Sequence, residues 1–156
     1  MEPKIMERDS FLVIGTSTRV TKENETSDYY TSIWKEFERR WREVEPHSVD
    51  NAFYGLSFSG YDEGAFEYIA GMAVKDVPAV PNGLVIREVP AARYVVFSCP
   101  LTAIGETYRY IFREWLPGSP VALSITAPVF EQYPPVGEEE TPVLIHVPIV
   151  EKPREV

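Results

Sequence analysis

The stretch SDYYTSIWKEFERRWREV, residues 27–44, predicts an amphipathic helix. Its apolar residues recur at helical spacing along one stripe, while the charged residues lie largely opposite. Ser27 or Asp28 can cap the first turn, and Pro46 ends the helix. The stripe consists of Tyr30, Ile33, Trp34, Phe37 and Trp41.

A second amphipathic segment, residues 102–116, resembles the first. Thr102 is its expected cap, and Pro117 follows its last turn. When Trp41 is aligned with Trp115, Trp34 falls on Tyr108. This match indicates that one structural unit occurs twice in the chain.

Segments with alternating apolar and polar residues flank both helices and predict strands. They are residues 11–20, 52–60 and 66–74 around the first helix, and 84–97 (bent at Pro90), 129–133 and 143–149 around the second. A turn at 61–64 joins two of them, 134–142 is a solvated loop, and 153 onward is a tail.

This order predicts a single α+β domain over residues 1–156. Two strand-helix-strand-strand repeats, at about 8–76 and 82–151, form a curved antiparallel sheet. The two helices cover the sheet, and a ligand cleft lies between the halves.

Composition and motif content argue against several classes of function. The formal charge of −9 opposes a large phosphate-binding surface, so direct nucleic-acid binding is not expected. The first residues lack the apolar run of a signal peptide or membrane span, and Cys99 has no partner for a disulfide, which favours the cytoplasm. His47 and His146 stand apart, so we expect no metal site, and no cofactor motif is found.

Glu131 is the main candidate for a functional side chain. It lies in the strand-like segment PVFEQY, on the same face as Val129 and Tyr133. From the residues alone, an exposed strand glutamate is the ordinary interpretation, and a buried anion in an aromatic pocket is the functional one. Glu67 and Glu88 are also strand glutamates that could face it, although solvated positions are the simpler expectation for both.

Cys99 and His146 could in principle form a nucleophile pair, but a small buried cysteine is the simpler interpretation.

The chain resembles the GyrI-like small-molecule-binding family, which is also the effector-binding domain of AraC-type and MerR-type multidrug-sensing regulators. The resemblance covers most of the chain and depends on the order and spacing of several short segments. These are Tyr54-Gly55, Phe66-Glu67-Tyr68-Ile69-Ala70-Gly71, Val89-Pro90, Tyr94-Val95-Val96-Phe97, Trp115-Leu116-Pro117, Phe130-Glu131-Gln132-Tyr133 and Ile145-His146-Val147-Pro148-Ile149.

The resemblance implies a cleft in which the glutamate of an F-E-x-Y motif, here Glu131, meets lipophilic and often cationic drug-like compounds among aromatic rings. The aromatic candidates for this cleft are Tyr54, Phe58, Tyr68, Phe97, Tyr108, Trp115 and Tyr133. The chain lacks room for the DNA-binding helix-turn-helix of the regulators and is similar to stand-alone members.

Two other roles occur among stand-alone members and stay open. One is hydrolysis of reactive cyclopropane-containing compounds, in which Glu131 would be catalytic. The other is a protein-interaction role similar to that of the gyrase inhibitors. An enzyme would need a second ionisable group within reach of Glu131, whereas a binding module needs only the anion and the rings.

Overall fold

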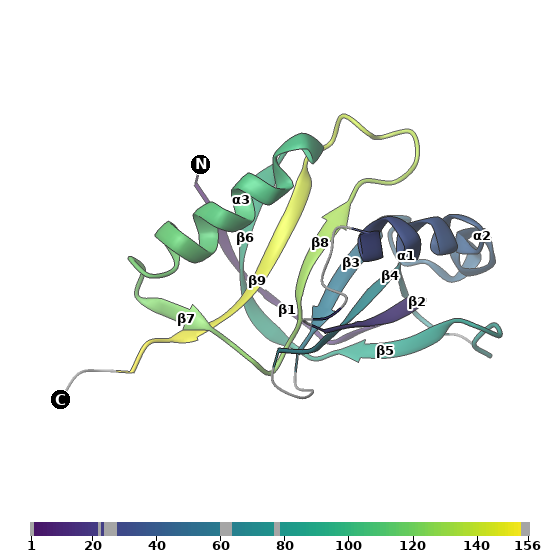
Figure 1. The fold of residues 1–156 in the computed structure, drawn as a ribbon, viewed down its shortest axis with the longest axis horizontal. Coiled ribbons are helices and arrows are strands. Elements are labelled where there is room, and N and C mark those ends of the chain that lie inside the picture. The colour runs from purple at the N-terminus through teal and green to yellow at the C-terminus, as the bar shows by residue number, and fades with distance from the viewer. Residues whose placement is uncertain (1, 22, 24–27, 60–63, 77–78, 154–156) are drawn as a thin grey trace.

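The computed structural model describes residues 2–21, 23, 28–59, 64–76 and 79–153. The strands are β1 (Lys4–Arg8), β2 (Phe11–Val20), β3 (Phe53–Phe58), β4 (Phe66–Val74), β5 (Val85–Val89), β6 (Ala92–Cys99), β7 (Val121–Leu123), β8 (Val129–Tyr133) and β9 (Val143–Glu151). The helices are α1 (Asp28–Glu38), α2 (Trp41–Val44) and α3 (Ile104–Tyr110), with the short helical turns η1 (Glu45–His47), η2 (Leu101–Ala103) and η3 (Ile111–Trp115). The predicted α+β class and curved antiparallel sheet are confirmed (Figure 1).

The order of the strands is β1-β6-β9-β8-β3-β4-β2-β5, with β7 paired to β9, and every pairing is antiparallel. This order is symmetric. If β1, β2, β3 and β4 are exchanged with β5, β6, β8 and β9, the same order is read from the other edge. The two repeats are therefore related by a pseudo-twofold axis between β3 and β8, which pair at the centre of the sheet.

The halves also exchange their first strands, which the sequence did not predict. β1 pairs with β6 of the second half, and β5 pairs with β2 of the first half. The expected bent strand over 84–97 is thus two strands with different partners, separated at Pro90, which has no N–H for a ladder. β1 was not predicted, because its residues KIMER show no apolar alternation and are mostly exposed at the sheet edge.

Both helical segments are more broken than expected. α1 ends at Glu38, and the short α2 begins at Trp41, whose ring packs on that of Phe53 with centroids 5.5 Å apart. In the second segment, the N–H of Leu116 donates to the carbonyl of Ile111 at 2.8 Å, which makes η3 a π-helical turn.

The expected caps and turn have mixed outcomes. α3 is preceded by Ala103 rather than capped by Thr102. The Ser27 cap and most of the expected turn at 61–64 lie outside the described residues.

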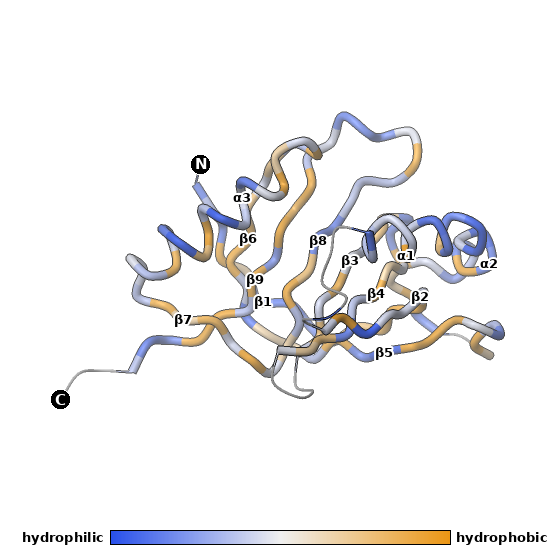
Figure 2. Tube along the Cα trace, viewed as in Figure 1, coloured by the Kyte–Doolittle hydropathy of each residue, from blue (hydrophilic) through white to orange (hydrophobic). Residues whose placement is uncertain are grey.

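The curved sheet is buried on both faces. On the helix side, α1 covers a cluster that includes Tyr68 and Met72, while α3 covers one that includes Phe97 and Ile145. The inner face holds a third cluster, with Tyr54 and Phe130 among its members. In Figure 2 the strands are largely hydrophobic, whereas the loop between β8 and β9 is mostly hydrophilic. Because both faces are buried, neighbouring residues on one strand serve different clusters.

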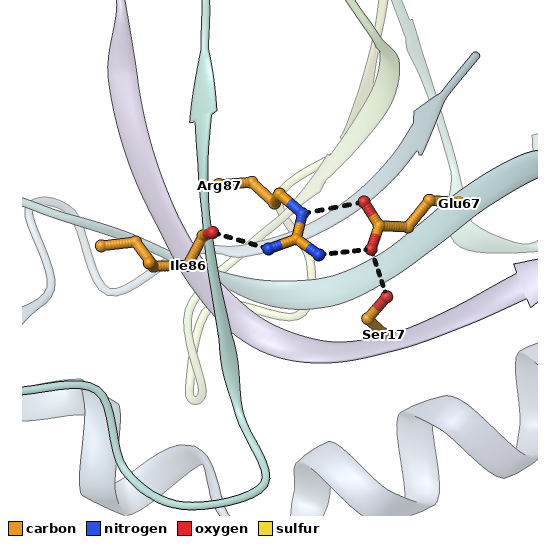
Figure 3. Close-up of polar contacts among 4 residues, drawn as sticks. All are labelled: Ser17, Glu67, Ile86 and Arg87. Carbon is orange, nitrogen blue, oxygen red and sulfur yellow. Dashed lines mark hydrogen bonds and ion pairs between the residues drawn. The ribbon is translucent and has the colours of Figure 1, made fainter. Parts of the chain in front are cut away.

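An arginine secures each exchanged strand on the inner face. Arg8 of β1 donates to the Tyr54 hydroxyl at 3.0 Å. Arg87 of β5 donates to both carboxylate oxygens of Glu67 in β4, at 3.0 and 2.9 Å, and the Ser17 hydroxyl donates to the same carboxylate at 2.6 Å (Figure 3). Glu67 was expected to be solvated, but it is 7% exposed and charge-paired because β5 crosses into the first half.

We expect Arg87→Met to lower the free energy of unfolding by about 1–3 kcal/mol, because it removes the two charged hydrogen bonds that Arg87 donates to the buried Glu67 carboxylate. Arg93→Met, at an exposed position of β6, is the matched control and should change stability by less than about 0.5 kcal/mol. Urea denaturation measures both. Equal effects would show that the Arg87–Glu67 pair does not hold β5 in place.

Candidate functional site

The centre of the molecule is the pair Gly55–Glu131, the middle of the five residue pairs that join β3 to β8. Both positions face the helices. A Cβ atom on Gly55 would lie 2.2 Å from the Tyr68 hydroxyl and 3.1 Å from Glu131 Oε1. Glycine is therefore what allows a carboxylate and a tyrosine hydroxyl to occupy this position together.

The Glu131 side chain is only 5% exposed, and tyrosines from different elements converge on it. Tyr108 of α3 donates to Oε2 at 2.5 Å, and Tyr133 of β8 donates to Oε1 at 3.1 Å. Trp34 of α1 donates from Nε1 to the Tyr68 hydroxyl at 3.0 Å. We call the set of Glu131, Tyr68, Tyr108, Tyr133 and Trp34 the tyrosine–glutamate cluster. It joins both helices to the strands at the pseudo-twofold axis.

Burial raises the pKa of Glu131 to about 7, although hydrogen bonds from Tyr108, Tyr133 and Tyr68 favour the charged form and oppose the rise. Burial, followed by the nearby Glu131 charge, also raises the pKa values of Tyr68, Tyr108 and Tyr133 well above the usual value. Within the described residues, no lysine, arginine or histidine pairs with the carboxylate. The carboxyl group therefore has a pKa near neutrality and no cationic partner in the part of the chain that the structure describes.

A cavity of about 790 Å³, which we call the larger cavity, lies on one side of the cluster. Trp34 and Tyr133 of the cluster form part of its wall. Among the described residues, Glu38 and Glu139 are the charged side chains in the wall, and both are acidic. The other lining residues are Phe37, Trp41, Phe53, Leu101, Pro134, Val136, Thr141 and Val143. The cavity is thus aromatic and apolar with a negative rim.

A cavity of about 340 Å³, the smaller cavity, lies on the other side, and Tyr108 forms part of its wall. Its other lining residues are Tyr30, Ser57, Ser59, Phe66, Phe112, Leu123, Ser124, Ala127 and Val129. Its wall contains three serine hydroxyls and no charged side chain among the described residues. The two cavities therefore differ in chemistry as well as in size.

The structure brings Tyr68, Tyr108 and Tyr133 to Glu131, but it places the other four aromatic candidates elsewhere. Tyr54 and Phe58 lie on the inner face, because they alternate with Gly55 and Ser57 along β3. Phe97 and Trp115 pack against each other under α3, with ring centroids 5.3 Å apart. These four positions belong to the core and line neither cavity.

Sequence reasoning did not select Trp34 or Gly55 for the site. The signal for Trp34 was present, since the alignment of the two helices placed it on Tyr108, and both residues now belong to the cluster. Gly55 carries no such signal, because its role depends on the strand that pairs with it.

The Cys99–His146 pair does not form. Cys99 packs under α3, whereas His146 lies on the inner face, stacked on Phe130 with centroids 4.2 Å apart. Burial, followed by the nearby Arg8 charge, lowers the pKa of His146 to about 3.

Among the described residues, no group of three or more His, Cys, Asp or Glu side chains could hold a metal ion. None of the described helices combines the length and apolar character needed to cross a membrane.

A protein-family comparison matches nearly the whole chain. The model of the Cass2 family, described as integron-associated effector binding protein, matches residues 4–149. The transcriptional regulator BrlR of Pseudomonas aeruginosa is 30% identical over 118 residues, which are 74% of this chain and 42% of BrlR. The chain therefore spans less than half the length of this curated relative.

Solved structures share the fold. SAV2435, solved with bound tetraphenylphosphonium, has a TM-score of 0.79 and 14% identity, with 96% of this chain and 94% of that chain covered. The integron cassette protein VCH_CASS2 of Vibrio cholerae has a TM-score of 0.71 and 21% identity, with 95% of each chain covered. At these identities the likeness concerns the fold alone.

The pKa of Glu131 predicts an unusual pH dependence of stability. The folded pKa of about 7 lies above the ordinary 4.5, so the unfolded state releases the proton first and stability falls as pH rises through this window. Between pH 5.5 and pH 8, Glu131 should therefore cost the wild type about 2 kcal/mol of folding free energy. Both pH values lie above the isoelectric point near 4.8, so the protein carries a net negative charge at each.

Glu131→Gln removes the titrating carboxyl group and serves as the reference in urea denaturation at the same pH values. The stability of the wild type minus that of Glu131→Gln should decrease from pH 5.5 to pH 8. A difference that stays constant over this range would show that Glu131 does not titrate as described.

Gly55→Ala should lower the free energy of unfolding by about 1–3 kcal/mol, because the new methyl group must displace Tyr68 or the carboxylate in a packed region. Gly105→Ala in α3 is the control, since the nearest atom to its Cβ would be 3.8 Å away. In a helix that change should be neutral or stabilising by up to about 1 kcal/mol. Thermal and urea denaturation distinguish the two, and a harmless Gly55→Ala would contradict the packing argument.

Proposed function

Because the chain belongs to the Cass2 family of integron-associated effector-binding proteins, whose fold is GyrI-like, we propose that it binds lipophilic cations in the larger cavity, with Glu131 as the selecting anion. The observation that carries this proposal is the state of Glu131. Its carboxylate is 5% exposed, is held by tyrosine hydroxyls, and pairs with no cationic side chain of the described residues.

A buried carboxylate without a cation is costly, and its raised pKa expresses that cost. A bound cation compensates the charge and holds the carboxylate ionised. The ligand must be lipophilic, because a strongly hydrated cation would lose too much solvation energy on entering an apolar cavity.

The wall of the larger cavity suits such a ligand. Rings of Trp34, Trp41 and Phe53 offer apolar contact and negatively polarised faces to a cation. Glu38 and Glu139 at the rim are exposed and add attraction outside the cavity, in keeping with the net charge of −9. The cavity volume lies in the range of drug-sized ligands.

Tyr133 connects the cavity to the anion. Its ring lines the larger cavity, and its hydroxyl donates to Glu131 Oε1 at 3.1 Å. In our proposal the cation approaches Oε1 as the Tyr133 hydroxyl moves aside, while Tyr108 keeps its 2.5 Å bond to Oε2. The shared fold of SAV2435, which was solved with the lipophilic cation tetraphenylphosphonium, supports this class of ligand.

The surroundings of Glu131 favour binding over hydrolysis. Its side-chain partners are phenols, and within the described residues no second carboxylate, histidine or cysteine bonds to it. Glu67 and His146 lie on the inner face, across the sheet. General acid–base hydrolysis would be served best by a second group whose pKa lies near neutrality, whereas burial raises the pKa values of Tyr68, Tyr108 and Tyr133 well above their usual value. A hydrolase would instead show turnover of a reactive electrophile that Glu131→Gln abolishes.

We expect Glu131→Gln to weaken binding of methyltriphenylphosphonium about 5- to 150-fold, because a charged partner contributes roughly 1–3 kcal/mol. Neutral triphenylphosphine oxide, which has a similar shape, should change much less. Lowering the pH from 8 to 5.5 should also weaken binding of the cation to the wild type by about 5- to 30-fold, since the carboxyl group becomes protonated below about 7.

Isothermal titration calorimetry measures these affinities. Glu139→Gln, at the exposed rim, is the control and should reduce cation affinity by less than about threefold. Equal losses for the cation and the neutral compound, or an unchanged cation affinity in Glu131→Gln, would contradict the assignment of Glu131 as the selecting anion.

A further inference from the structure

We propose that the smaller cavity is a second subsite of the same binding site and takes an uncharged, hydrogen-bonding arm of the ligand. The ligand is then an elongated molecule with an aromatic cationic head and a neutral polar arm. The inference rests on the proposed function, since the head is the cation that Glu131 selects.

The register of β3 and β8 places the two cavities in line. On the helix side, three residue pairs follow one another along these strands: Phe53–Tyr133, Gly55–Glu131 and Ser57–Val129. The first pair lines the larger cavity, and the third lines the smaller one. Glu131 lies between them, two residues or about 7 Å of strand from each. A molecule of moderate length that lies along the strands would cross the carboxylate.

The pseudo-twofold axis relates the two cavities. Trp34 and Glu38, one helical turn apart on α1, line the larger cavity. Tyr108 and Phe112, also one turn apart on the second helical segment, line the smaller cavity. The smaller cavity is therefore the second repeat's counterpart of the larger one. Both are formed by a helix face lying over the β3–β8 seam.

Each oxygen of the Glu131 carboxylate accepts a hydrogen bond from a tyrosine in the wall of a different cavity. Tyr133, from the wall of the larger cavity, donates to Oε1, and Tyr108, from the wall of the smaller cavity, donates to Oε2. In our proposal, one tyrosine hydroxyl separates the carboxylate from each cavity. Rotation of both tyrosines would leave Glu131 as the link between two parts of one site.

The chemistry of the smaller cavity points to a neutral occupant. One carboxylate compensates one cation, and the wall of the smaller cavity adds no further charge among the described residues. It does add hydroxyl groups. The Ser124 hydroxyl already shares a hydrogen bond of 2.9 Å with the Thr126 hydroxyl, whereas within the described residues no hydrogen bond uses the Ser57 hydroxyl. Phe66, Phe112 and Leu123 provide apolar contact for a carbon chain.

The test compares two phosphonium probes with the same head. (6-Hydroxyhexyl)triphenylphosphonium carries a hydroxyl group at the end of its arm, and hexyltriphenylphosphonium lacks it. In the wild type the hydroxylated probe should bind about threefold or more tightly than the hexyl probe, as one additional hydrogen bond predicts. Simple adhesion to apolar surface would give the opposite order, because the hexyl arm is more lipophilic.

Ser57→Leu fills the smaller cavity and removes a hydroxyl, so the preference for the hydroxylated probe should disappear. Ser59→Phe, at an exposed position of the same wall, should do the same and covers the case in which Ser57→Leu does not fold. Ser98→Leu, an exposed position on β6 outside both cavities, is the matched control and should retain the preference. A preference that survives in both cavity variants, or that is absent from the wild type, overturns the second subsite.

Failure of the proposed function gives a different result. If methyltriphenylphosphonium does not bind the wild type at all, the cation site is wrong, and the smaller cavity is then tested with neutral benzyl alcohol. Amide chemical-shift changes at Ser57 and Ser124 that Ser59→Phe abolishes and Ser98→Leu retains would still support a site for an uncharged hydrogen-bonding group. Their absence would overturn it.

Discussion

The antiparallel pairing of β3 with β8 is the constraint on which the rest of the structure depends. It joins the two repeats into one sheet, and its central pair puts Gly55 opposite Glu131. Because Gly55 has no side chain, the Tyr68 hydroxyl and the Glu131 carboxylate can share the space above the strand. A shift of one residue in this register would turn Glu131 to the inner face, among the aromatic rings around Phe130.

The two faces of the sheet differ in what they bury: the inner face holds a packed core, and the helix side holds the two cavities. The inner face holds a core that includes Tyr54 and Phe130, and the exchanged strands β1 and β5 are tied to it through Arg8 and Arg87. These inner-face contacts hold the edge strands without any contribution from the residues that line the two cavities. The helix side can therefore leave space over the β3–β8 seam, where both cavities lie.

Glu131 shows how a buried acid can be retained although no cationic side chain in the described part of the chain pairs with it. Tyrosine hydroxyls satisfy both oxygens, but they do not neutralise the charge, so burial still raises the pKa to about 7. A site of this kind is less stable when ionised and empty than when a cation occupies it. In the proposed function, the same imbalance that costs folding free energy at high pH favours binding of a positively charged ligand.

The sequence by itself determined the α+β class and the duplication, because helical and strand periodicities are local and the alignment of Trp34 with Tyr108 can be read from the chain alone. Its alternation did not show that Glu131 is buried, since an exposed glutamate was the ordinary interpretation and only the resemblance to the GyrI-like family implied a cleft position. It did not determine the exchange of β1 and β5, since strand partners are chosen by contacts between distant segments. For the same reason Tyr54 and Phe58 could not be separated from Tyr68 before the curvature and register of the sheet were known. Only the tertiary structure decided which rings surround Glu131, because alternation tells which residues share a face but not which face meets the helices.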